Sequence, residues 1–175
     1  LIFIPLITKT LGARGYGLWQ QMLVTVGILS PIASLGLNNA LVRFLPIKEK
    51  KKDKQEIFYS ILIFKLLTSI IIASLIVIFA DFIAGLFFDD FTIIVIITAL
   101  VFLLGGSNII CYFYFRAIRK IKLYSILRIL DSYSKVILAY YMILNGKGVL
   151  GVILAYFAVE IFFTTVSLIL IIHDI

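Results

Sequence analysis

Long apolar stretches, separated by short polar segments, make up most of this 175-residue chain. Five of them cover residues 16–43, 57–80, 91–115, 124–144 and 148–172, and the apolar residues before Pro5 read as the tail of a further one. A 24-residue helix is about 36 Å long, which exceeds the ~30 Å hydrocarbon core of a bilayer. The pattern predicts an all-α, polytopic transmembrane helix bundle with about five full spans plus the end of a first one.

The composition supports this class. Apolar residues make up 63% of the chain and charged residues 14%, against about 45–50% and 25% in soluble domains. The net charge of +7 would indicate nucleic acid in a soluble chain. In a membrane chain, basic residues gather in the cytoplasmic loops. We therefore expect a multi-pass protein of the cell (plasma) membrane and no nucleic-acid partner.

The basic residues also predict an orientation, because they are unevenly divided between the polar connectors. Six lie around the connector 46–56 and five around the connector 116–123, against three on the opposite side. The two basic connectors are predicted to be cytoplasmic. Both are expected to touch anionic lipid headgroups, and residues 116–128 are expected to form an interfacial helix. The residues are Arg43, Lys48, Lys50, Lys51, Lys52 and Lys54 in the first group, and Arg116, Arg119, Lys120, Lys122 and Arg128 in the second.

Two features interrupt the apolar stretches. Pro31 removes a helical hydrogen bond and crowds the preceding turn, so a kink is expected in the stretch 16–43. Gly105 and Gly106, followed by Ser107, permit bending or close helix contact midway along 91–115.

Charged side chains also occur at membrane depth. Arg128, Asp131 and Lys135 share one narrow face of the stretch 124–144, while Lys65 lies about 12 Å into its stretch and Glu160 near the middle of the last. If one of these charged side chains faced lipid near the bilayer centre, the free energy of insertion would rise by at least ~2.5–3.5 kcal/mol. We expect these side chains to face a hydrated space between helices.

Two interpretations of these charges remain open. In the first, they form a cationic-leaning lining for an anionic headgroup, since intramembrane ionisable residues mark substrate or ion paths. In the second, Arg128, Asp131 and Lys135 form an intrahelical salt-bridge ladder. Lys65 would then snorkel to the interface, and Glu160 would be protonated or paired with it. The full set of candidate cavity residues is Lys65, Arg128, Asp131, Lys135, Glu160, Asn38 and Arg43.

Signals of bond-making chemistry are weak. His173 is the one histidine and stands beside Asp174, without a nucleophile or metal-ligating partners nearby in the sequence. The glycine pairs lack the third glycine and the flanking strand of a nucleotide-binding loop. We expect no enzyme activity, no cofactor and no metal site.

Two segments resemble a known family. The first contains Pro5, Lys9, Leu11, Gly12, Tyr16 and Gly17, and the second is the run LGLNNALVRF at 35–44, with Gly36 and Arg43. Both are similar to segments of polysaccharide flippases, the O-antigen and lipid-linked oligosaccharide transporters of the multidrug/oligosaccharidyl-lipid/polysaccharide exporter superfamily. Lys9 stands where many relatives have arginine.

The resemblance implies a two-lobe transporter fold with a central cavity of alternating access. Residues 1–175 would form a single transmembrane lobe, the N-terminal one, less most of its first helix and without the second lobe. The substrate would be a polyprenyl-diphosphate-linked glycan moved to the outer leaflet for cell-surface polysaccharide biosynthesis. Lys65, Arg128 and Lys135 would hold the diphosphate, while Asp131 and Glu160 balance charge or couple to an ion (H⁺ or Na⁺).

Three alternatives stay open at this point. The nearest is an ion-coupled drug or metabolite exporter of the same superfamily, which would need an essential carboxylate in the first helix. A membrane-embedded glycan polymerase or ligase is a more distant one, since that class uses a large outer loop and the longest outer connector here has about ten residues. The last alternative is that the chain is one half of a two-lobe transporter and has no function alone.

Overall fold

The described part of the chain is an all-α bundle, which confirms the predicted fold class. A computed structural model describes the backbone of residues 3–174 and the side chains from Thr10 to Asp174. Seven α-helices and one 3-10 turn occur in this range, and no strand does. They are α1 (Phe3–Ser34), α2 (Leu37–Phe44), η1 (Leu45–Ile47), α3 (Lys51–Ile78), α4 (Ala80–Phe87), α5 (Thr92–Ala117), α6 (Ile121–Leu144) and α7 (Gly148–Asp174).

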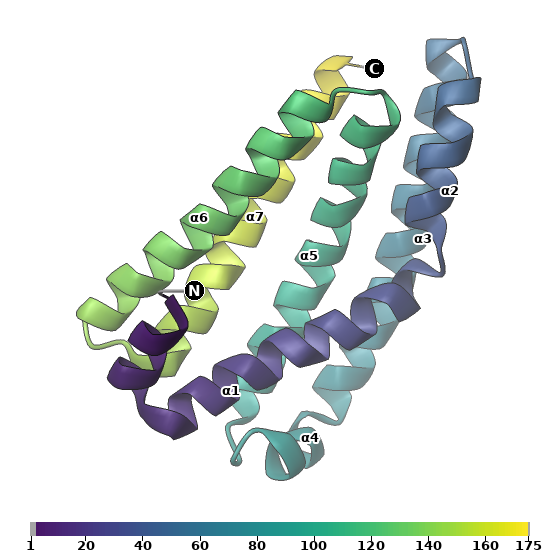
Figure 1. The fold of residues 1–175 in the computed structure, drawn as a ribbon. Helices are drawn as coiled ribbons and strands as arrows, with labels where there is room; N and C mark the ends of the chain where they lie inside the picture. The colour runs from purple at the N-terminus through teal and green to yellow at the C-terminus, as the bar shows by residue number, and fades with distance from the viewer. Residues whose placement is uncertain (1–2, 175) are drawn as a thin grey trace.

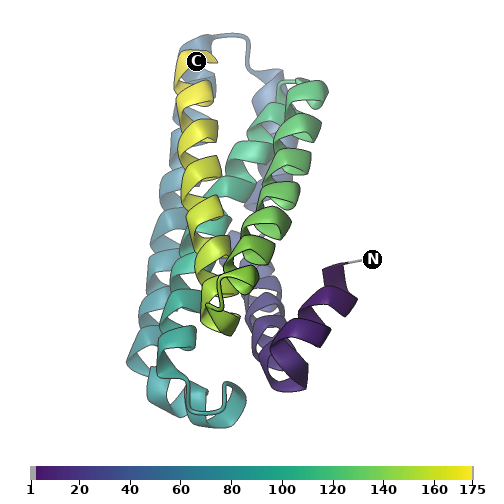
Figure 2. The same cartoon turned by 90° about the vertical axis from the view of Figure 1, so that its left-hand side faces the viewer.

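Helix α5 forms the centre of the bundle. Between Thr92 and Phe115 it carries no charged residue, and most of its side chains are buried. An all-round apolar helix is stable where neighbours cover every face. Helices α6 and α7 pack against each other along one side, α2 and α3 lie on the other, and α1 crosses the bundle obliquely (Figure 1). The short helix α4 closes one end, and the quarter-turned view shows the first turns of α1 projecting beside α6 and α7 (Figure 2).

Three of the described helices, α3, α5 and α7, are long and apolar enough to cross a membrane. A fourth span results if α1 and α2 are counted as one bent helix pair. Helix α6 is also 24 residues long, but Arg128, Asp131 and Lys135 interrupt its apolar run, so it is not among these three. The predicted stretch 124–144 is therefore a helix of spanning length whose charges need partners inside the bundle.

The helix breaks differ from those expected. The predicted connector 9–15 is helical except at Gly12, whose φ of 69° interrupts α1. The stretch 16–43 is split at Leu35 and Gly36, which both have left-handed φ values (44° and 77°), and the two pieces meet at 53°. Pro31 itself keeps helical dihedral angles, and its carbonyl accepts a hydrogen bond from the Leu35 N–H (3.2 Å). The bend thus lies one turn beyond the proline, where glycine permits the left-handed conformation.

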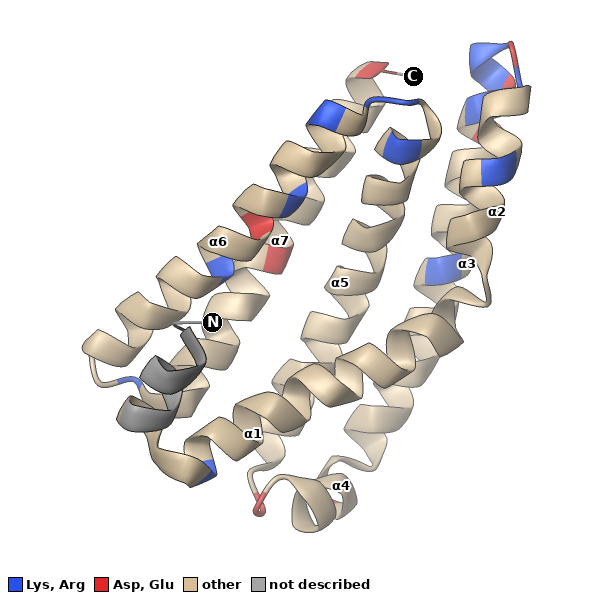
Figure 3. Ribbon diagram, viewed as in Figure 1, with Lys and Arg blue, Asp and Glu red and all other residues tan. Residues whose placement is uncertain are grey.

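Most of the basic residues gather at one end of the bundle, which we call the basic end, where α3 begins and where α5 joins α6 (Figure 3). The orientation prediction requires this common placement of the two basic connectors. The predicted interfacial helix over 116–128 is wrong, because α5 runs to Ala117 and α6 starts at Ile121. Between them lies a tight turn in which Arg119 has a φ of 62° and the Lys120 N–H donates to the Phe115 carbonyl (2.9 Å).

Candidate functional site

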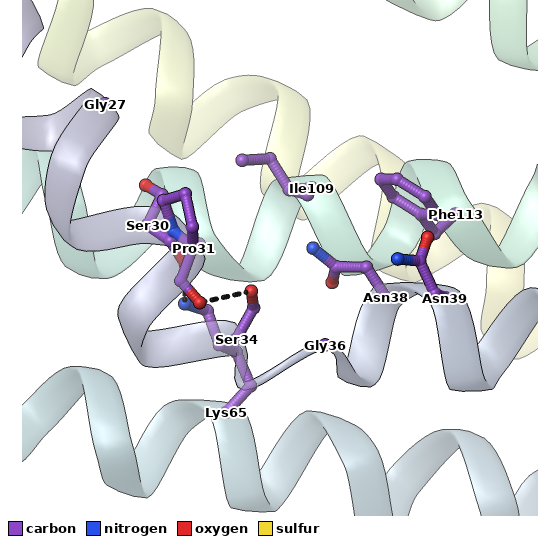
Figure 4. Close-up of a pocket in the computed structure, with 11 residues that line it drawn as sticks. Gly27, Ser30, Pro31, Ser34, Gly36, Asn38, Asn39, Lys65, Ile109 and Phe113 are labelled. Carbon is purple, nitrogen blue, oxygen red and sulfur yellow. Dashed lines mark hydrogen bonds between the residues drawn. The ribbon is translucent and has the colours of Figure 1, made fainter.

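A cavity of about 420 Å³ lies where α1 gives way to α2, against α3 and α5. We call it the Lys65 pocket. Several of its wall residues are exposed, among them Pro31, Gly36 and Asn39, so the pocket opens to the surface. Its wall is lined by Gly27, Ser30, Pro31, Ser34, Gly36, Asn38, Asn39, Lys65, Gly106, Ile109 and Phe113 (Figure 4).

Among the described residues that form this wall, Lys65 is the only one with a charged side chain, and it is 2% exposed. Its Nζ donates one long hydrogen bond to the Ser30 carbonyl (3.4 Å) and lies 5.6 Å from the centre of the Phe102 ring. Among the described residues no carboxylate lies within ion-pair distance of it. An ammonium group has three donors, and a buried charge is costly unless it is paired. Lys65 is therefore a buried cation suited to an anionic ligand.

Gly106 makes room for this side chain. A Cβ at position 106 would lie 2.8 Å from Lys65 Cε and 3.3 Å from its Nζ. Such a contact is too short, so any larger residue would displace the ammonium group from its place against α5. The Ser69 hydroxyl is also beside Gly106, and it is buried without a hydrogen-bond partner in the described chain.

The amides of Asn38 and Asn39 add uncharged hydrogen-bonding groups to the pocket (Figure 4). Both lie in the first turn of α2, directly after the bend at Gly36. The Asn38 Oδ1 is buried and has no hydrogen-bond partner in the part of the chain described. One ammonium group with nearby amide and hydroxyl donors is a combination that binds phosphate oxygens.

A second polar site, the buried charge cluster, lies between α5, α6 and α7. Lys135 Nζ is 2.6 Å from Glu160 Oε1 and 3.0 Å from Asp131 Oδ1. The Asn108 amide donates to Glu160 Oε2 (3.1 Å), and both carboxylates are less than 10% exposed. The Lys135 ammonium also lies 5.9 Å from the centre of the Tyr156 ring. One lysine ammonium thus pairs with two carboxylates inside the bundle.

The structure assembles the predicted charges differently from either sequence interpretation. Of the expected ladder, the pair between Asp131 and Lys135 is present, whereas Arg128 is exposed and lies 5.6 Å from the Tyr112 ring. Glu160 pairs with Lys135, and the pair with Lys65 considered above is not formed. Lys65, Arg128 and Lys135 therefore do not form one common cationic lining.

Two consecutive glycines of α5 face the two sites, one glycine for each site. A Cβ at Gly105 would lie 3.5 Å from the Glu160 carboxylate, whereas one at Gly106 would meet Lys65. Successive residues of a helix point about 100° apart. Helix α5 therefore presents the buried charge cluster on one face and the Lys65 pocket on the next.

The remaining sequence candidates occupy other places. Arg43 is exposed, stacks near the Phe44 ring (5.7 Å) and does not line the Lys65 pocket. Gly12 and Gly36 take the left-handed conformations that break the helices. Tyr16 packs near Trp19, with 5.7 Å between the ring centres. Leu11 is half-buried and Gly17 is exposed, and the side chains of Pro5 and Lys9 lie outside the described residues.

Sequence reasoning missed Asn108, which binds one carboxylate of the buried charge cluster. An amide in the middle of an otherwise apolar stretch was the available signal. Ser30 and Ser34 were also missed, and serines at membrane depth are too common to point to a pocket without the bend beside which this one forms.

These observations define a helical membrane protein with ionised and amide side chains in the interior of its bundle. Comparison with protein families places it more narrowly. The profile of the family described as "Polysaccharide biosynthesis protein" matches residues 1–174, and the chain belongs to this family. Comparisons with curated proteins and with solved structures gave no match.

Proposed function

We propose that this protein flips a polyprenyl-diphosphate-linked glycan from the cytoplasmic to the outer leaflet of the plasma membrane, without bond-making chemistry of its own. Membership of the polysaccharide biosynthesis family supports a role in making or exporting a glycan. The observation that carries the transport step is the Lys65 pocket, where a buried cation without a carboxylate partner in the described chain lines an open cavity.

The diphosphate headgroup is the part of the substrate that this pocket would bind. Phosphate oxygens accept hydrogen bonds from ammonium and amide groups, and charge-assisted bonds are the strongest of these. The proposal assigns this role to Lys65 with Asn38 and Asn39, and no longer to Lys135, whose ammonium is occupied by two carboxylates. Arg128 stays outside the proposed site because it is exposed on α6.

The buried charge cluster is the proposed site for a coupling ion, H⁺ or Na⁺. It contains Asp131 and Glu160 against the single charge of Lys135, so one negative charge remains unbalanced within it. The competing function, an ion-coupled drug or metabolite exporter, would need an essential carboxylate in the first helix. The described wall of the Lys65 pocket contains no carboxylate.

A flipping assay tests the proposal directly. The protein is reconstituted into vesicles with a fluorescent polyprenyl-diphosphate glycan, and transfer is followed with a membrane-impermeant quencher. The change Lys65→Met keeps the size of the side chain and removes its charge. Because a hydrogen bond to a charged group contributes about 1.5–3 kcal/mol, the apparent affinity for the glycan lipid in this assay should fall about 10- to 150-fold.

Two comparisons make the result specific. Lys65→Arg, which keeps the charge, should retain more activity than Lys65→Met. Lys122→Met removes a charge from an exposed position on α6 and should leave flipping unchanged. Wild-type flipping by Lys65→Met would contradict the proposal.

A further inference from the structure

Two adjoining hollows lie at the basic end of the bundle and share Lys54 and Ile118. The larger, about 370 Å³, lies between η1, the first turn of α3 and the turn from α5 to α6. The smaller, about 150 Å³, reaches the end of α7 at Asp174. Figure 2 shows this end of α7 close to the top of α3. Segments far apart in the sequence thus meet at one place, which we call the basic-end site.

Positive charge exceeds negative charge in this site. Lys51, Lys54, Arg119 and Lys120 line the two hollows, against the single carboxylate of Asp174. That carboxylate is already occupied, because it accepts hydrogen bonds from Lys120 and from the Tyr114 hydroxyl (3.3 Å). The other three cations have no carboxylate within ion-pair distance in the part of the chain described. The site therefore has a surplus of unpaired positive charge.

Three of these cations are held in positions that are unfavourable by themselves. Lys51 and Lys54 lie in the first turn of α3, where the helix dipole is positive and anions are the favoured neighbours. Arg119 has a φ of 62°, a left-handed conformation that glycine adopts without steric cost. Unfavourable features that converge on one place indicate a functional role there. A bound anion would offset the repulsion between these cations and the helix dipole.

We propose that the basic-end site binds the phosphate of an anionic membrane phospholipid, with Lys54 and Arg119 as its main contacts. A planar guanidinium can hold two phosphate oxygens at once, and the half-buried Lys54 adds a second charge from α3. A lipid is favoured over a soluble phosphate because Ile47 and Ile121, which flank the turns that form the site, are 69% and 61% exposed. Exposed apolar side chains beside cations are typical of a membrane interface.

The proposal is independent of glycan transport, so binding is measured by the lipid-induced rise in melting temperature of the purified protein. Phosphatidylglycerol is added to protein in micelles that contain phosphatidylcholine of the same acyl chains. The double variant Lys54→Gln/Arg119→Gln should bind the anionic lipid more than tenfold more weakly than the wild type. The matched control is Lys52→Gln/Lys122→Gln, which removes the same charge at positions close in sequence but outside the hollows and should lose less than threefold.

A second variant guards against misfolding. Arg119→Gly removes the cation and the unfavourable φ together, so the protein should melt at a higher temperature in phosphatidylcholine and show a smaller rise with phosphatidylglycerol. Three results would overturn the proposal. Equal losses in the two double variants would mean diffuse attraction only. A rise in melting temperature with phosphatidylglycerol as large in Arg119→Gly as in the wild type would show that Arg119 does not bind the lipid. The same stabilisation by inorganic diphosphate would assign the site to a soluble anion.

Discussion

Removing the Lys135 ammonium is the most informative perturbation of the buried charge cluster. Lys135→Met keeps a side chain of similar length but leaves Asp131 and Glu160 without a cation at ion-pair distance among the described residues. The two carboxylates are 6% and 8% exposed, and Lys135 Nζ lies 3.0 Å and 2.6 Å from them in the wild type. Breaking a buried ion pair by removing one partner costs about 3–5 kcal/mol, because the remaining charge stays desolvated. We expect the free energy of unfolding to fall by that amount.

The loss is measurable with the single tryptophan of the chain. Trp19 is buried, and its ring centre lies 6.3 Å from that of Tyr156, which in turn faces Lys135. Thermal unfolding in detergent micelles, followed by the fluorescence of Trp19, should show a melting temperature lower by about 6–20 °C. This range follows from about 2–4 °C per kcal/mol for a chain of this size.

A triple variant separates the ion pairs from simple packing loss. Asp131→Asn, Lys135→Met and Glu160→Gln together remove every charge of the cluster at nearly constant volume. Uncharged replacements of a buried ion pair are often neutral, so the triple variant should be more stable than Lys135→Met alone. If the single and triple variants unfolded at the same temperature, the ion pairs would not be the source of the loss, and the reasoning would be refuted.

Two glycine pairs give further predictions. Gly106→Ala places a Cβ 2.8 Å from Lys65 Cε, whereas the Cβ of Gly105→Ala lies 3.5 Å from the Glu160 carboxylate, an ordinary contact. Gly106→Ala should therefore slow flipping, and Gly105→Ala should keep the wild-type rate. Gly36→Ala forces a left-handed φ of 77° on alanine and should lower the unfolding free energy by about 1–2 kcal/mol. Gly17 lies in a helix with open space around it, so Gly17→Ala should raise the unfolding free energy by up to about 1 kcal/mol. Chemical denaturation measures both glycine variants, and a reversed order of stability would contradict the assigned backbone conformations.

The bend between α1 and α2 shows where local patterns mislead. Pro31 predicts a kink through its missing N–H, yet the chain turns at Leu35 and Gly36. A proline disfavours the helix, but the bend forms where the backbone can take left-handed angles at low cost, and Gly36 permits this. The segment 116–128 is a second case in which a local pattern misleads. Its basic and apolar residues are typical of an interfacial helix, but the segment contains the turn after α5 and the first part of α6.

The sequence by itself determined the class of protein, because apolar stretches as long as a bilayer is thick permit only helices when backbone groups must bond within their own segment. It also determined the pair between Asp131 and Lys135, since a spacing of four residues on a helix brings side chains together. Only the tertiary structure decided that Glu160 joins this pair while Lys65 faces a separate pocket. That outcome depends on which face of α5 each neighbouring helix covers, a relation between distant segments that the spacing within any one helix does not contain.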